Sequence, residues 1–89
     1  MLEIVFKSQF KKDFKKLKFS GKNLQELQAV IDALQKSKQL DPTYHDHELK
    51  GNWRGYRECH IQSDWLLIYQ QMPTMLVLVR TGSHSELFE

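Results

Sequence analysis

Three histidines in the C-terminal half of the chain, His47, His60 and His84, stand among polar and aromatic residues. The densest stretch covers residues 46–60 and reads DHELKGNWRGYRECH, and Asp64 and Trp65 follow it closely. Histidine changes its charge near neutral pH, so it both donates and accepts protons under physiological conditions. Several histidines brought together by a fold therefore suggest general acid–base chemistry.

A metal site is the competing interpretation of the same histidines. His45 and His47 alternate on a predicted strand and would point to one side, where His60 or His84 could complete a ligand set. The chain has neither a CxxC nor an HExxH pattern, and the neighbours Cys59 and His60 would face opposite ways on a strand. We therefore predict neither a metal nor another cofactor.

The same half of the chain supplies groups that suit RNA. Guanidinium and ammonium groups bind phosphate and stabilise the charge of a phosphorane. Trp65 and Phe88 could stack on nucleobases, although aromatic residues at such positions also serve as core residues. The cationic candidates are Lys50, Arg54, Arg57 and Arg80.

Length and composition indicate one small domain in a reducing compartment. A chain of 89 residues is long enough for a single modest core without a disulfide or a structural metal. Its one cysteine, Cys59, has no partner for an internal disulfide. The N-terminal residues are too charged for a signal peptide, and no apolar run approaches the length of a membrane span. We expect a cytoplasmic protein.

Positive charge is concentrated in the N-terminal quarter. Residues 1–22 carry seven lysines against Glu3 and Asp13, which gives +5, whereas the net charge of the whole chain is +2. Such a distribution suggests an anionic partner, and a solvated helix face is the alternative. The lysines predicted to contact RNA or the ribosome are Lys11, Lys12, Lys15, Lys16 and Lys18.

The elements that must position these groups follow from hydrophobic periodicity. Residues 2–6 predict a strand, and a helix capped by Ser8 should follow and end at Gly21. Asn23 and Glu26 resemble a capping box for a second helix, which should end near Lys38.

From residue 45 the period changes to two, and residues 56–61, 65–70 and 75–81 predict strands. Their short connections favour antiparallel neighbours. We therefore predict an α+β fold, with an antiparallel sheet of four to five strands and the two N-terminal helices packed on one face. On the first of these three strands Tyr56, Glu58 and His60 share a face, which should be the open one. Asp64, just across a turn from His60, is expected to hydrogen-bond an imidazole nitrogen.

The spacing of these unusual residues resembles one known family along essentially the whole chain. The pattern DHxLxGxWxGYRxxHxxxDWxLIY at residues 46–69, followed by RTGxHxxLF at residues 80–88, is similar to the YafQ branch of the RelE/ParE toxin superfamily. Glu58 departs from it, because an aspartate is common there. The functional positions of that branch map onto His47, His60, Asp64, Trp65, His84 and Phe88.

The resemblance implies the toxin of a type II toxin–antitoxin pair that cleaves translated mRNA as a ribosome-dependent endoribonuclease. The implied partners are a cognate antitoxin, the ribosome with its rRNA, and mRNA. As a hypothesis, His47 or His60 is the base that takes the 2′-OH proton, Asp64 orients the imidazole site, and His84 is the acid. Arg57 and Arg80 would stabilise the phosphorane. The alternative is a non-catalytic, ParE-like toxin that binds a protein target.

Overall fold

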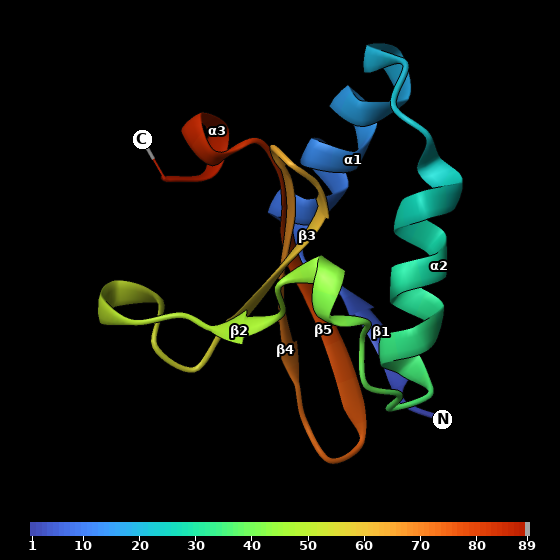
Figure 1. Ribbon diagram of the computed structural model, residues 1–89, viewed down its shortest axis with the longest axis vertical. Helices are drawn as coiled ribbons and strands as arrows, with labels where there is room; N and C mark the ends of the chain where they lie inside the picture. Colours follow the sequence, from blue (N-terminus) through green and yellow to red (C-terminus); the bar gives the residue numbers. More distant parts are fainter. Residues whose placement is uncertain (89) are drawn as a thin grey trace.

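The computed structural model describes residues 1–88, which form a five-stranded sheet with helices on both faces (Figure 1). The strands are β1 (Glu3–Phe6), β2 (His47–Glu48), β3 (Arg57–Gln62), β4 (Trp65–Gln71) and β5 (Met75–Gly82). The helices are α1 (Ser8–Ser20), α2 (Leu24–Gln35) and α3 (His84–Phe88), with short 3₁₀ turns η1 (Pro42–Tyr44) and η2 (Gly51–Trp53). No helix among residues 1–88 is long and apolar enough to cross a membrane.

The sheet is mixed, with the strand order β1-β5-β4-β3-β2. The predicted antiparallel pairing is correct for β2 to β5, which follow one another along the chain. It is wrong for β1, which pairs with β5 in parallel and matches Glu3 to Met75. The physical reason is that loop lengths constrain only consecutive strands, whereas α1 and α2 return the chain between β1 and the rest of the sheet.

Helix α1 begins at Ser8, the residue predicted to cap it, and so starts one residue earlier than expected. Lys7 occupies the N-cap position, so Ser8 is the first helical residue and makes no capping hydrogen bond. At the other end Gly21 adopts a left-handed conformation with φ of 79°, as expected for a glycine that stops a helix.

Helix α2 starts as predicted but ends three residues before Lys38. The Asn23 side chain caps it by accepting a hydrogen bond from the Gln25 N–H. Glu26 makes no reciprocal bond of a capping box; its carboxylate accepts a hydrogen bond from Gln62 Nε2 at 2.9 Å. The helix stops because Ser37 turns left-handed, with φ of 58°, and the N–H of Lys38 then closes back on the Ala33 carbonyl.

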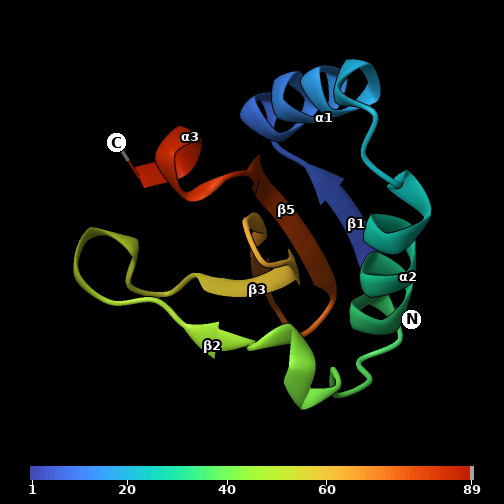
Figure 2. The same ribbon diagram turned by 45° about the horizontal axis from the view of Figure 1, so that its top comes forward.

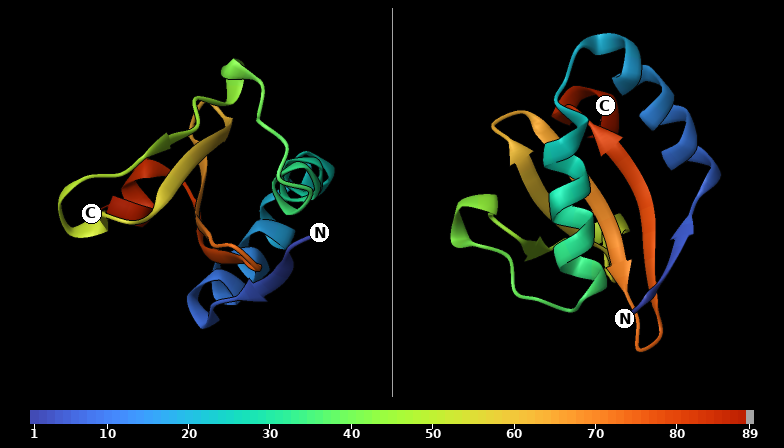
Figure 3. Two further views of the ribbon diagram at one scale, coloured as in Figure 1. Left: turned by 90° about the horizontal axis from the view of Figure 1, so that it is seen from below. Right: turned by 90° about the vertical axis from the view of Figure 1, so that its right-hand side faces the viewer.

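The two faces of the sheet are covered unequally. One face carries the main core, in which α1 and α2 pack on β3, β4 and β5, as predicted for the two N-terminal helices. The opposite face has a small cluster in which Leu87 of α3 packs on Leu66 and Ile68. Figures 2 and 3 show α3 and α2 on opposite sides of the sheet. The second face is thus left largely open between α3 and β2.

A buried carboxylate joins α1 to the end of β5. The Asp13 carboxylate accepts hydrogen bonds from Nε and Nη2 of Arg80, both at 3.0 Å, and from the Thr81 N–H at 3.2 Å. Asp13 is 5% exposed, although it lies between lysine-rich stretches of the sequence. Its position between Phe10 and Leu17 on the buried side of the helix is the signal that marks it.

We expect Asp13→Ala to lower the free energy of unfolding by about 3 kcal/mol, near the lower end for breaking a buried ion pair because Arg80 keeps part of its hydration. Asp32→Ala, which removes an exposed carboxylate from α2, is the control and should change stability by less than about 0.5 kcal/mol. Urea unfolding followed by circular dichroism measures both. Equal midpoints for the two variants would contradict a structural role for Asp13.

Candidate active site

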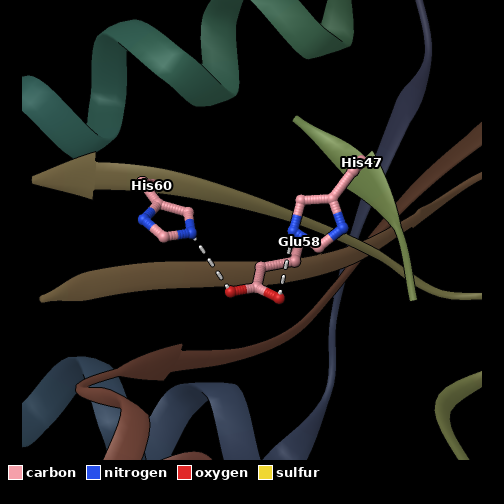
Figure 4. A group of neighbouring side chains, drawn as sticks. All are labelled: His47, Glu58 and His60. Carbon is pink, nitrogen blue, oxygen red and sulfur yellow. Dashed lines mark ion pairs between the residues drawn. The ribbon is translucent and has the colours of Figure 1, made fainter. Parts of the chain in front are cut away.

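A single buried carboxylate gathers three imidazoles on the open face of the sheet. The Glu58 side chain is 6% exposed, and its oxygens lie 3.4 Å from His60 Nε2, 3.6 Å from His47 Nε2 and 3.8 Å from His84 Nε2. Figure 4 shows His47 and His60 on either side of this carboxylate. A buried charge without partners is strongly unfavourable, so the imidazoles and the carboxylate stabilise one another's positions.

Three separate elements deliver these imidazoles. His60 lies two residues beyond Glu58 on β3, so both side chains emerge on one face, as predicted. His47 lies on β2 directly opposite Glu58 in the antiparallel register. His84 is the first residue of α3, which follows β5. The site therefore depends on the pairing of β2 with β3 and on the placement of α3.

Asp64 serves a different histidine from the one expected. It lies across the β3–β4 turn from His60, yet its Oδ1 accepts the backbone N–H of His84 and lies 3.1 Å from His84 Nδ1. The backbone N–H of His84, followed by its side chain, lowers the pKa of Asp64. The prediction of an Asp64–His60 pair is wrong because this turn directs the carboxylate to the start of α3.

His60 is held in its neutral form more strongly than a free histidine. Partial burial of the ring lowers its pKa from 6.5, and the neighbouring His84, His45 and His47 add to this effect, whereas the Glu58 carboxylate opposes it. A neutral imidazole accepts a proton, so this environment suits a general base.

Aromatic rings continue the site on both sides of the catalytic candidates. The His60 ring centroid lies 5.6 Å from that of His84 and 5.6 Å from that of His45. Phe88, 40% exposed, lies 6.3 Å from His84 and 5.8 Å from Trp53. Phe88 is therefore available to a substrate beside His84, where the sequence placed it.

Trp65 is not available to a substrate. It is fully buried in the core on the helix side, where its indole N–H donates a hydrogen bond to Thr81 Oγ1 at 3.0 Å. The prediction that it stacks on bases is wrong because residue 65 shares the helix-covered face of β4 with Leu67 and Tyr69.

The arginines expected to stabilise a phosphorane have other partners. Arg57 Nε donates to Asp46 Oδ1 at 3.3 Å, and the Tyr69 hydroxyl donates to the same oxygen at 2.6 Å. Tyr69 belongs to the helix-side core, so Arg57 lies on the face opposite Glu58, as strand alternation requires. The Arg80 guanidinium is engaged by Asp13, which raises its pKa. The role predicted for Arg57 at the phosphate is therefore wrong, whereas the role predicted for Arg80 is not tested by its ion pair with Asp13 and stays a prediction.

The remaining predicted cations are on the surface. Lys50 and Arg54 are exposed at the two ends of η2, which also carries Trp53. The five lysines of α1 are exposed too, and Lys18 Nζ lies 5.5 Å from the Phe14 ring centroid. These side chains remain free to contact a polyanion.

One set of residues has the geometry to hold a cation. Ligand atoms of His47, Glu58 and His60 all lie within 4.8 Å of one another. Two imidazoles and a carboxylate are donors that zinc and copper accept. A cation bound there would occupy the atoms that are otherwise able to move protons.

The chain is similar in sequence to bacterial toxins. The family described as "Bacterial toxin of type II toxin-antitoxin system, YafQ" matches residues 2–89. The "mRNA interferase toxin YafQ" of Escherichia coli K12 is 36% identical over 87 residues, which cover 97% of this chain and 95% of that protein.

Solved structures agree with this similarity. A copper-bound mutant toxin from Helicobacter pylori superposes with a TM-score of 0.95 at 48% identity, over 99% of this chain and 100% of that chain. The toxin in the E. coli DinJ-YafQ complex gives 0.92 at 34% identity and covers both chains fully. These matches confirm the predicted α+β fold.

We expect Glu58→Gln to lower the pKa of His60 further, because the substitution removes the carboxylate that opposes the effect of burial. A folded state with a lowered histidine pKa binds fewer protons than the unfolded state, so the free energy of unfolding falls as the pH drops below about 6.5. In the variant, whose His60 pKa is lower still, the free energy of unfolding should continue to fall down to a lower pH.

NMR titration of the imidazole Cε1–H signals measures the pKa, and Glu48→Gln, on an exposed β2 residue, is the matched control. An unchanged His60 pKa in Glu58→Gln would show that the carboxylate is not coupled to this imidazole.

Proposed function

This chain belongs to the YafQ family of type II toxin–antitoxin toxins, and we propose that it cleaves mRNA on the ribosome through acid–base catalysis by its histidines. The family and the mRNA interferase class expected from the sequence are confirmed by its curated relatives. The observation that supports this mechanism is the contact of one buried carboxylate, Glu58, with three imidazoles on an open face. A non-catalytic toxin that binds a protein target would not need this cluster.

The proposed reaction is the attack of a ribose 2′-oxygen on the adjacent phosphorus. His60, whose pKa is lowered, accepts the 2′-OH proton. The bond between phosphorus and the 5′-oxygen breaks, and His84 donates a proton to that oxygen. Imidazoles make both proton transfers, so the reaction as proposed needs no metal, and its products are a 2′,3′-cyclic phosphate and a free 5′-hydroxyl. His47, opposite Glu58, remains the second candidate base.

The surroundings of His84 support its role as the acid. The Asp64 carboxylate lies 3.1 Å from Nδ1 and the Glu58 carboxylate 3.8 Å from Nε2. The contact of Nδ1 with Asp64 fixes the orientation of the ring. Phe88, in contact with this ring, would hold a base of the substrate.

Cations outside the imidazole cluster contribute to binding. We infer that Lys50 and Arg54, at the ends of η2 beside Phe88, contact phosphates on either side of the cleaved bond. The α1 lysines, Lys11, Lys12, Lys15, Lys16 and Lys18, form a separate basic surface for ribosomal RNA.

The antitoxin is the second expected partner. In the E. coli complex a YafQ toxin is bound to DinJ, and we infer a cognate antitoxin for this chain. An acidic antitoxin segment would complement the α1 lysines. A groove beside them, lined by Phe6, Phe10 and Phe14 together with Lys11, would receive its apolar side chains.

The expected compartment is the cytoplasm, where ribosomes translate mRNA.

Burial raises the pKa of Cys59 to about 12, so the thiol is an inert core residue rather than a redox group.

We expect His84→Ala to slow cleavage of translated mRNA by about 10²- to 10⁴-fold, the usual contribution of a general acid. Ser85→Ala, at the neighbouring exposed residue, should cleave like the wild type. A translation extract with primer-extension mapping measures the rate, and end analysis should find a 5′-hydroxyl on the downstream fragment. A 5′-phosphate there, or equal mRNA survival with wild type and His84→Ala at inhibitory concentrations, would refute the mechanism.

Replacing Lys11, Lys12, Lys15 and Lys16 by Gln should weaken ribosome binding and make it less sensitive to salt. The slope of the logarithm of the affinity against the logarithm of the salt concentration should become shallower by about one for each phosphate that the variant no longer binds. Co-sedimentation at several salt concentrations measures this. Lys36→Gln/Lys38→Gln, which removes exposed charges that follow α2, is the control. The antitoxin affinity of the α1 variant should also fall. If the slope is unchanged, the α1 lysines do not bind phosphates and form a solvated helix face.

A further inference from the structure

An open groove lies beside His60 on the side away from Phe88. It has a volume of about 630 Å³ and is lined by Thr43, His45, His47, His60, Gln62 and Ser63. This size is within the range of small-molecule sites, roughly 300–1,000 Å³. His47 and His60 belong to the catalytic cluster, but the other four side chains have no part in the proton transfers proposed above.

His45 is held in this groove by an uncommon backbone conformation. Its φ of 49° and ψ of 46° are left-handed, and among residues 1–88 only Ser37 is another non-glycine residue with positive φ. The turn is closed by η1, where the His45 N–H donates to the Pro42 carbonyl. The exposed ring is thereby placed edge-to-face against His60.

The rings follow one another in the order His45, His60, His84 and Phe88, with centroid separations of 5.6, 5.6 and 6.3 Å. A phosphate between His60 and His84 would therefore have one neighbouring nucleotide toward Phe88 and the other toward His45. Only the first of these has a residue that binds its base in the mechanism above.

We propose that the groove is a nucleobase-binding subsite for the second of these nucleotides, and that it gives the enzyme a sequence preference there. The inference rests on the proposed ribonuclease function, whose substrate it specifies. His45 packs against the base, and the side chains of Thr43, Gln62 and Ser63 bind its edge.

The chemistry of the lining selects a base rather than a phosphate. None of the six lining residues is Lys or Arg, the side chains that commonly bind phosphate. Hydroxyls, an amide and imidazoles instead provide the mixture of donors and acceptors that single-stranded RNA bases require, together with a ring for stacking.

Gln62 indicates which bases fit. Its amide nitrogen donates a hydrogen bond to Glu26 Oε2 at 2.9 Å, which fixes the orientation of the amide. The amide oxygen is then the group offered to a ligand, and it accepts from an N–H donor on the edge of a base. Adenine, cytosine and guanine offer an exocyclic amino group, and uracil offers its N3–H, at different places on the base edge. The fixed amide therefore gives the subsite a preference among bases by the position of this donor.

Cleavage of an mRNA library with randomised codons in a translation extract tests the preference. Wild type should prefer some bases over others at one position beside the cut, and Gln62→Leu should remove that bias. His45→Ala should raise KM about tenfold or more with little change in kcat, as expected when a stacking ring is removed. Gln25→Leu, at an exposed α2 residue, is the control and should match the wild type. If both groove variants kept the base preference and the KM of the wild type, the subsite would be overturned.

A binding measurement separates this inference from the proposed function. An uncleavable 2′-O-methyl trinucleotide, titrated into the toxin in the presence of EDTA, should shift the NMR signals of the His45 ring and the Gln62 side-chain amide. If the oligonucleotide binds and these signals do not move, the subsite is overturned, even if the enzyme cleaves mRNA. Shifted signals without any cleavage of mRNA would sustain the subsite and refute the ribonuclease function.

Discussion

The buried Glu58 carboxylate is the constraint on which the active site depends. At 6% exposure it has lost most of its contact with water, and the polar groups nearest to its oxygens are imidazoles from β2, β3 and α3. Three elements that are distant in sequence must therefore meet at one point on the open face. The same contacts hold the imidazoles close together, as the proposed proton transfers around one phosphate would need.

The other face of the sheet provides the rigidity behind this cluster. Asp13 binds Arg80 and the Thr81 N–H, and the Thr81 hydroxyl accepts from Trp65 while donating to the Leu66 carbonyl. This buried network fixes the end of β5, from which α3 and His84 begin two residues later. Trp65, which the sequence marked for RNA, thus supports the site through the scaffold. A network whose polar groups are all paired specifies one arrangement.

Charge and aromatic character are divided among different surfaces. In the proposed function, the exposed lysines of α1 attract RNA independently of its sequence, whereas the rings beside His60 and His84 stack on individual bases. Affinity for a large polyanion and choice of the cleaved position would then vary separately. We propose that His45 and Gln62 make this choice on one side of the cut and Phe88 on the other.

The sequence alone determined the elements, the family and the face shared by Glu58 and His60, because period-two alternation and hydrophobic spacing are local properties of the chain. It placed Asp64 beside the wrong histidine and left Trp65 exposed. Tertiary structure decided those points, since a turn direction and the register between strands depend on packing over the whole domain. The parallel pairing of β1 and the ion pair of Asp13 with Arg80, 67 residues apart, have the same origin. Local pattern specifies which side chains share a face, and only the assembled sheet specifies which of them meet.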